Sequence, residues 1–148
     1  MRANIIFVDD DPLVLSGLKR ALREQGELWD MEYVSTIADA ERLLSIQAFD
    51  VAVVDVFMPL KNGLELLKEL KSAPSTCRTE VIVLTGMQDE ELERKALELG
   101  AVEVLFKPVD TEHLAATIAA TLESGSPGSR LAARRQGTGE QKWKVEES

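Results

Sequence analysis

The stretch "AVVDVFMP", residues 52–59, decides the fold because an ionisable side chain follows directly on an apolar run. Ala52, Val53 and Val54 are apolar without alternation, which is typical of a strand covered on both faces of a parallel sheet. Asp55 comes next, and burial of its charge is costly unless a cation or a metal compensates it. This carboxylate therefore either caps a turn or faces a positive charge at the end of the strand.

Four further apolar runs flank this one, and stretches of helical periodicity separate them. Together the runs predict strands over residues 4–8, 31–35, 51–54, 81–85 and 102–106. Run 31–35 is more polar than the others and suits an edge of the sheet. The periodic stretches predict helices from residue 12 to about 25 and over residues 37–47, 63–71, 88–99 and 111–122. This alternation predicts an α/β fold, (βα)5, with one five-stranded parallel sheet between two layers of helices.

The first predicted helix begins at Pro12, after the expected N-cap Asp11. Val14, Leu18 and Ala21 share its predicted buried face. Beyond the last predicted helix, the sequence "SGSPGS" is typical of a joint between ordered parts. We therefore expect one domain over residues 1–123 and a flexible C-terminal tail or linker stub over residues 124–148.

Charge and composition exclude several classes of protein. The chain of 148 residues has a net charge of −9, and residues 1–123 hold 12 basic and 23 acidic side chains. Such a domain should repel nucleic acid, so no direct nucleic-acid contact is expected. No apolar run approaches the roughly 20 residues of a membrane span, and Cys77 is the single cysteine. These features predict a cytoplasmic protein without membrane insertion.

Polar side chains follow four of the predicted strands at their carboxyl ends, where parallel sheets bind ligands. Asp9 and Asp10 follow the first strand, Asp55 the third, Thr85 ends the fourth and Lys107 follows the fifth. Three carboxylates in one crevice do not ionise readily without a cation, and their oxygen ligands suit Mg2+. A carboxylate beside Mg2+ that faces an ammonium and a hydroxyl group can accept a phosphoryl group. Asp55 is the candidate nucleophile.

Four segments resemble a known family: "FVDDDP", "VVDVFMPLKNGLELL", "VLTG" and "VLFKP" are similar to the four sequence blocks of bacterial two-component response-regulator receiver domains, which include chemotaxis regulators. The resemblance covers about residues 3–123. It implies a flavodoxin-like, doubly wound (βα)5 sandwich. It also implies a phosphorylation-dependent signalling switch instead of a conventional enzyme.

By that resemblance, Asp55 is the phosphoacceptor. Asp10, Asp55 and the backbone carbonyl of Phe57 would bind Mg2+, and Asp9 would act through water. Thr85 would be the switch hydroxyl and Lys107 the phosphoryl-binding lysine.

The resemblance also makes predictions for the loops around the site. Pro59 and Gly63 match the family's loop after the phosphoacceptor, and Pro108 would follow a cis peptide bond. Many receivers carry an aromatic residue three positions before the lysine, whereas this chain has Val104, so coupling through a swinging aromatic ring is not expected.

Two positions flank the approach of a hydrolytic water in receivers, and here they hold Phe57 and Met87. Neither side chain can orient a water molecule by hydrogen bonding, and both are bulky. They predict a long-lived phosphorylated state.

The expected phosphoryl donor is a histidine kinase or a phosphotransfer protein. The expected output is a change in partner binding, or a homodimer, through the face formed by residues 88–99, 102–106 and 111–122. Three other functions stay open: a haloacid-dehalogenase-like Mg2+-dependent phosphatase, a nucleotide- or flavin-binding module, and a receiver-like binding module that is never phosphorylated. A phosphatase of that type uses a second Asp two residues after the nucleophile, and this chain has Phe57 at that position. A nucleotide-binding module would need a glycine-rich loop after the first strand, and this chain has "DDDP" there.

Overall fold

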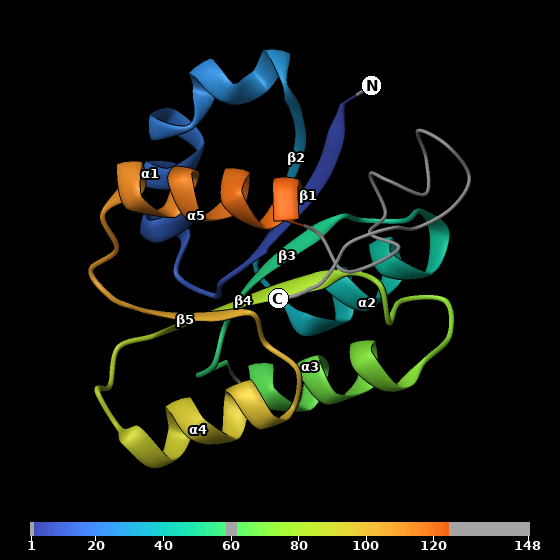
Figure 1. The fold of residues 1–148 in the computed structure, drawn as a ribbon. Helices are drawn as coiled ribbons and strands as arrows, with labels where there is room; N and C mark the ends of the chain where they lie inside the picture. The colour runs from blue at the N-terminus through green and yellow to red at the C-terminus, as the bar shows by residue number, and fades with distance from the viewer. Residues whose placement is uncertain (1, 59–61, 125–148) are drawn as a thin grey trace.

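The computed structural model describes residues 2–58 and 62–124 (Figure 1). All five predicted strands and all five predicted helices are present, together with one 3-10 helix, η1. Their bounds are β1 Ala3–Val8, α1 Pro12–Ala21, η1 Arg23–Glu27, β2 Trp29–Val34, α2 Ile37–Ile46, β3 Val51–Asp55, α3 Gly63–Ser72, β4 Glu80–Thr85, α4 Glu90–Glu98, β5 Glu103–Phe106 and α5 Thr111–Ser124. From residue 125 onward, the predicted tail lies outside the described residues.

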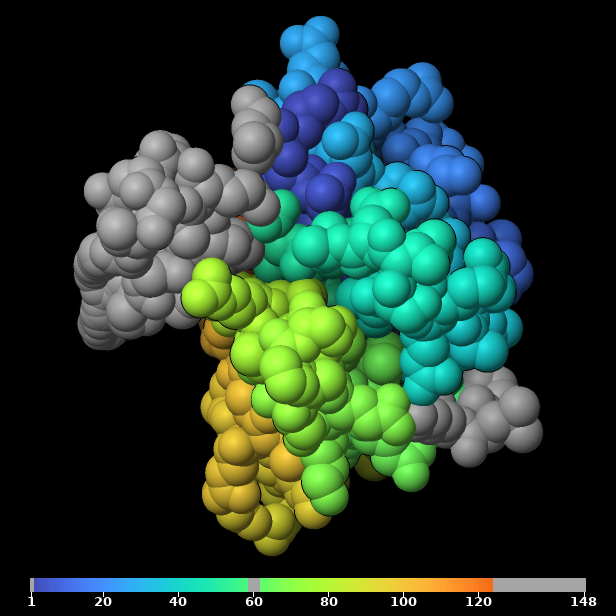
Figure 2. Space-filling model, turned by 90° about the vertical axis from the view of Figure 1, so that its right-hand side faces the viewer, coloured from blue at the N-terminus to red at the C-terminus, as the bar shows by residue number. Residues whose placement is uncertain are grey.

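The five strands form one parallel sheet in the order β2-β1-β3-β4-β5. Helices α1 and α5 cover one face, and α2, α3 and α4 cover the other (Figure 1). The prediction of a flavodoxin-like (βα)5 sandwich is confirmed, and the polar strand β2 lies at an edge as expected. Figure 2 shows α2 beside the chain from α3 to β4, where Leu44, Leu66 and Leu70 line a groove.

Strand β3 lies in the middle of the sheet, and its side chains enter both hydrophobic clusters. Ala52 and Val54 face α2, α3 and α4, whereas Val51 and Val53 face α1 and α5. All four are at most 1 % exposed. Burial on both faces explains why the run is apolar without alternation. It also places the end of β3 in the centre of the sheet edge.

The prediction for the first helix was wrong in two respects. Ala21 is exposed, and Leu22, which is 1 % exposed, joins Leu18 in the core. A spacing of four residues keeps both leucines on one side of the helix. The α-helix also ends at Ala21, short of residue 25, because a 3-10 turn follows at Arg23–Glu27.

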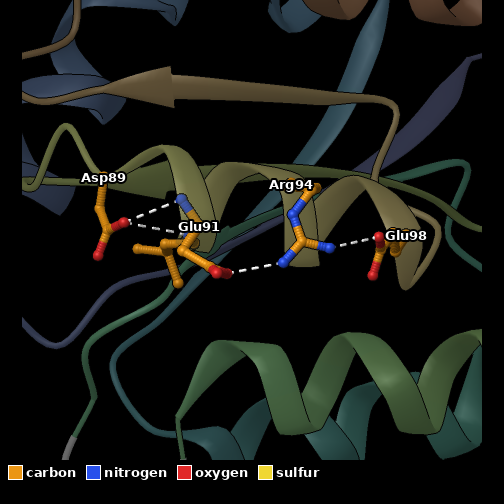
Figure 3. A network of polar contacts seen from close by, with 5 residues as sticks. Asp89, Glu91, Arg94 and Glu98 are labelled. Carbon is orange, nitrogen blue, oxygen red and sulfur yellow. Dashed lines mark hydrogen bonds and ion pairs between the residues drawn. The ribbon is translucent and has the colours of Figure 1, made fainter.

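Other element ends differ by one or two residues from the prediction. Strand β2 begins at Trp29 because it pairs with Ala3 of β1. Helix α4 begins at Glu90, later than predicted, because the side chain of Asp89 accepts hydrogen bonds from the N–H groups of Glu91 and Leu92 (Figure 3). Across the described residues, no helix has the length and apolar character needed to cross a bilayer.

Candidate functional site

The carboxyl ends of β1, β3 and β5 bring four charged side chains together. Asp9, Asp10 and Asp55 each contribute one carboxylate oxygen to a group of three. These three oxygens all lie within 4.8 Å of one another. The ammonium nitrogen of Lys107 lies 2.8 Å from Asp9 Oδ2 and 3.3 Å from Asp55 Oδ2. The cluster therefore contains three carboxylates and one ammonium group.

The turn after β1 fixes the first carboxylate. Asp9 Oδ1 accepts a hydrogen bond of 2.9 Å from the N–H of Asp11, whose own side chain accepts from Leu13 N and caps α1. Asp11 is therefore the N-cap, as predicted. Asp9 Oδ2 is shielded from solvent and accepts no hydrogen bond of regular geometry, so the Lys107 ammonium is its counter-charge. Asp10 differs because its side chain is exposed.

The carboxylate of Asp55 is held at the buried end of the central strand. The residue is 4 % exposed, and Oδ1 accepts a hydrogen bond of 3.2 Å from the N–H of Phe57. Behind it, the N–H of Gly63 donates to the carbonyl oxygen of Val56 at 2.8 Å, which joins the start of α3 to the end of β3. The carboxylate thus belongs to the cluster, and the chain that follows it is held to the start of α3 by this backbone hydrogen bond.

Burial sets the proton affinities of this cluster. Desolvation raises the pKa of Asp55, and the nearby charge of Asp9 raises it further; Lys107 and the Phe57 N–H oppose this shift without cancelling it. Desolvation lowers the pKa of Lys107, but its contacts with Asp9 and Asp55 outweigh that effect, so the net shift is upward. Lys107 therefore stays protonated near neutral pH and acts as a fixed cation.

The donor set fits a hard divalent cation. Three ionised carboxylates and one ammonium leave a net charge of −2, which a divalent ion would balance. The side chains are oxygen donors at the mouth of the cluster, where Asp10 is accessible to solvent. Exposed acids often gather without a metal, but here Asp9 and Asp55 are buried. Their burial makes the uncompensated charge costly.

Thr85 ends β4 next to β5, and it is 1 % exposed. Its Oγ1 accepts a hydrogen bond of 3.1 Å from the N–H of Met87 and lies 3.4 Å from the Met87 carbonyl oxygen. The hydroxyl is therefore engaged with its own loop, while the Thr85 carbonyl accepts from the N–H of Lys107 at 2.8 Å. The backbone thus joins the threonine to the lysine.

The side chains of Phe57 and Met87 are 51 % and 53 % exposed beside the ends of β3 and β4. Val104 is buried at 7 % exposure and belongs to the same hydrophobic cluster as Phe106. Val104 and Phe106 therefore lie on the same face of β5. The peptide bond between Lys107 and Pro108 is cis, as the resemblance implied.

Gly63 has a role that sequence reasoning did not find. A β-carbon at this position would lie 2.2 Å from the carbonyl oxygen of Asp55 and 2.9 Å from Val54 Cγ1. The glycine was matched only as part of a family loop. Its position at the first residue of a helix gave no signal of this close approach.

Comparisons with known proteins agree with this geometry. The family model described as response regulator receiver domain matches residues 5–119. The chain is 39 % identical over 140 residues to the transcriptional regulatory protein CpxR of Klebsiella pneumoniae, covering 83 % of this chain and 56 % of that protein. It is 34 % identical over 109 residues to the transcriptional regulatory protein MalR of Bacillus subtilis, covering 74 % and 46 %. The chain spans about half the length of these curated relatives.

Solved structures show the same likeness. A CheY-like response regulator receiver domain protein from Methanospirillum hungatei has a TM-score of 0.76 at 26 % identity, covering 83 % of this chain and 95 % of that one. The BeF3-activated receiver domain of DrrB, a response regulator of Thermotoga maritima, has a TM-score of 0.72 at 32 % identity, covering 83 % and 99 %.

Proposed function

The chain belongs to the response regulator receiver domain family of two-component signalling, and we propose that its Asp55 accepts a phosphoryl group from a histidine kinase or a phosphotransfer protein. In this step the phosphorus–nitrogen bond of a donor phosphohistidine breaks. A phosphorus–oxygen bond to the Asp55 carboxylate forms, and the imidazole leaves with the electron pair. The receiver family is regulatory, so this chain changes state upon modification instead of turning over a substrate.

One observation carries the proposal: Lys107 contacts both Asp9 and Asp55 in the same cluster, at 2.8 and 3.3 Å. A lysine beside a buried carboxylate can bind the oxygens of a phosphoryl group attached to that carboxylate. The neighbouring Thr85 hydroxyl is available to donate to a phosphoryl oxygen once it leaves the backbone of Met87.

We assign the metal to the acidic cluster. Asp10, Asp55 and the backbone carbonyl of Phe57 would hold Mg2+, which would neutralise charge on the phosphoryl oxygens. Asp9 would act through water, because its Oδ1 accepts from Asp11 and its Oδ2 faces Lys107. The exposure of Asp10 gives the ion a route of entry.

The output of the switch is a change in binding through the face formed by α4, β5 and α5, either to another protein or to a second copy. Movement of Thr85 towards a phosphoryl group would pull on the loop between β4 and α4. Thr85→Ala should therefore weaken the response. Val104 is buried and offers no aromatic ring that could swing, so Val104→Ala should cost only packing. CpxR and MalR are named transcriptional regulatory proteins, and an output of that kind would need a further domain or partner.

The same proposal covers the organisation and location of the chain. The expected boundary after residue 123 moves by one residue, because α5 ends at Ser124; the receiver domain would extend to that residue, and the expected tail or linker, from residue 125 onward, lies outside the described residues. The protein acts in the cytoplasm, where kinases of two-component systems transfer their phosphoryl groups.

The experiment that tests the proposal is intact-mass spectrometry after incubation with acetyl phosphate and Mg2+. We expect one added phosphoryl group on the wild type, none without Mg2+ and none on Asp55→Asn. Equal labelling of Asp55→Asn at the same rate would assign the chemistry to another residue. A turnover assay with phosphate esters distinguishes the proposed receiver from a phosphatase. A phosphatase would release phosphate continuously, and the receiver would not.

A further inference from the structure

A groove of about 490 Å3 lies along α5 and the first residues of β4 and β5. Part of its wall is apolar: Val102 is 40 % exposed, and Ala116 and Ala120 are exposed one helical turn apart. Two small side chains at this spacing lie on the same side of α5 and leave room for close approach of another segment. Glu103 adds an exposed carboxylate to the same groove.

The surroundings of the groove are strongly acidic. Residues 101–123, which contain β5 and α5, hold four acidic side chains and one lysine, a net charge of −3, and Glu80 of β4 also lines the groove. The groove therefore favours a positively charged occupant.

We infer that residues 130–135 of this chain, "RLAARR", bind in this groove. The segment carries three arginines and no acidic residue, and Leu131, Ala132 and Ala133 are apolar. It matches the groove in both charge and polarity. The same groove of a second copy would instead bring equal negative charge against this one, and like charges oppose the pairing of two such grooves.

The chain is long enough for this arrangement. Helix α5 ends at Ser124, and Thr121 near its end lines the groove. Residues 125–129 connect Ser124 to the basic segment, and a five-residue connection of this composition has a root-mean-square length of about 12 Å. Short connections of roughly 2–8 residues commonly join neighbouring helices. From His113 to Thr121 the groove extends along about 12 Å of α5.

Tethering strengthens the binding without further contacts. A segment joined by a short linker reaches an effective concentration in the millimolar range at its site. Binding of the segment does not depend on phosphorylation of Asp55. Because the groove flanks the face of α4, β5 and α5, a bound segment would compete there with any partner.

Nuclear magnetic resonance of the full chain tests the inference. The variant Arg130→Glu/Arg134→Glu/Arg135→Glu should shift the backbone amide signals of residues 102–103 and 116–120 relative to the wild type. The shifts should persist throughout a dilution series, because the contact is intramolecular. In the wild type, added salt should move the same signals in the direction of the variant.

The matched control reverses the other basic pair, Lys142→Glu/Lys144→Glu, and should leave the groove signals in place. Glu103→Lys should reproduce the shifts, and combining it with the triple arginine reversal should move them back towards the wild type. Unchanged groove signals in the triple variant would overturn the inference. So would equal shifts in the control, or a wild-type pattern that changes on dilution, since the last result would identify a second copy as the occupant.

Discussion

A β-carbon on Gly63 would lie 2.2 Å from the backbone carbonyl oxygen of Asp55, so the first residue of α3 touches the last residue of β3 at a distance that only glycine allows. The obstacle is backbone and cannot rotate away. Helix α3 begins here with a capping box in which Asn62 and Glu65 bond to each other's backbone N–H groups. The start of this helix and the end of the central strand therefore form one rigid unit.

The first prediction is that Gly63→Ala destabilises the protein by about 1–3 kcal/mol, the usual cost of forcing an extra group into a packed site. Urea denaturation gives the free energy of unfolding. Gly17→Ala is the control, because Gly17 lies within α1 and nothing comes within 4 Å of its added β-carbon. That change should be neutral or stabilise the helix by up to roughly 1 kcal/mol. Equal effects of the two substitutions would contradict the assigned contact.

The second prediction concerns pH in the absence of metal. Because the pKa of Asp55 is raised in the folded state, the folded protein favours the protonated carboxyl group. The resulting stabilisation is present below the unfolded pKa, near 3.8, and is lost as pH rises through the higher folded value. Asp55→Asn keeps a neutral group at all pH values. It should therefore unfold at higher denaturant concentration than the wild type near neutral pH, and this advantage should shrink in acid.

Asp11→Asn is the control for this pH series. Asp11 is exposed and caps α1, and asparagine caps helices about as well as aspartate. Its stability should follow the wild type across the whole range. If Asp55→Asn is less stable than the wild type at neutral pH without metal, the carboxylate of Asp55 is better compensated than its burial indicates.

The third prediction is that Mg2+ stabilises the folded protein through the acidic cluster. A ligand that binds only the folded state adds RT ln(1 + [L]/Kd), so the melting temperature should rise with Mg2+ concentration. Asp10→Asn should weaken this rise by removing an accessible ligand, and Asp11→Asn should not. Chelation by EDTA should return the wild type to its metal-free melting temperature. A rise of the same size in Asp10→Asn would place the ion elsewhere.

The fourth prediction concerns the lifetime of the phosphorylated state. Phe57 and Met87 are about half exposed beside the site and offer no side-chain group that orients water. A tenfold change in hydrolysis requires only about 1.4 kcal/mol in the barrier. Phe57→Asn and Met87→Glu should therefore shorten the lifetime after the phosphoryl donor is removed, as followed by intact mass. Lifetimes unchanged in both variants would show that these side chains do not control hydrolysis.

Much of the fold could be predicted from local pattern. Continuous apolar runs identified four of the strands because the sheet is covered on both faces, and the more polar run 31–35 identified the edge strand β2. Asp11 followed by Pro12 marked the start of α1. Ala21 shows where the pattern was insufficient. Ala21 and Leu22 are adjacent, and either fits the helical periodicity of the buried face. Only the packing of the folded protein shows that Leu22 is the buried one. The start of β2 at Trp29 depended on pairing with Ala3, a partner distant in sequence.

The candidate site shows the same division. The order of the strands brings Asp9, Asp55 and Lys107 to one edge, and the prediction of a shared edge needed no side-chain detail. The hydrogen bond of the Thr85 hydroxyl to the backbone of Met87 could not be predicted, because it depends on the path of the loop after β4. The contact of Gly63 also depends on tertiary structure, since a helix start gives no sign of the strand behind it.

The bridge that Lys107 makes between Asp9 and Asp55 has a kinetic consequence. Both carboxylate oxygens of Asp55 are engaged in this state, Oδ1 by the N–H of Phe57 and Oδ2 by the ammonium group. Each of these oxygens keeps a second lone pair for attack, but the ammonium group draws charge from Oδ2 and weakens it as a nucleophile. Transfer of the lysine from Asp55 to the oxygens of an incoming phosphoryl group would restore that charge, so the ease with which one lysine exchanges partners would influence how quickly the protein responds to its donor.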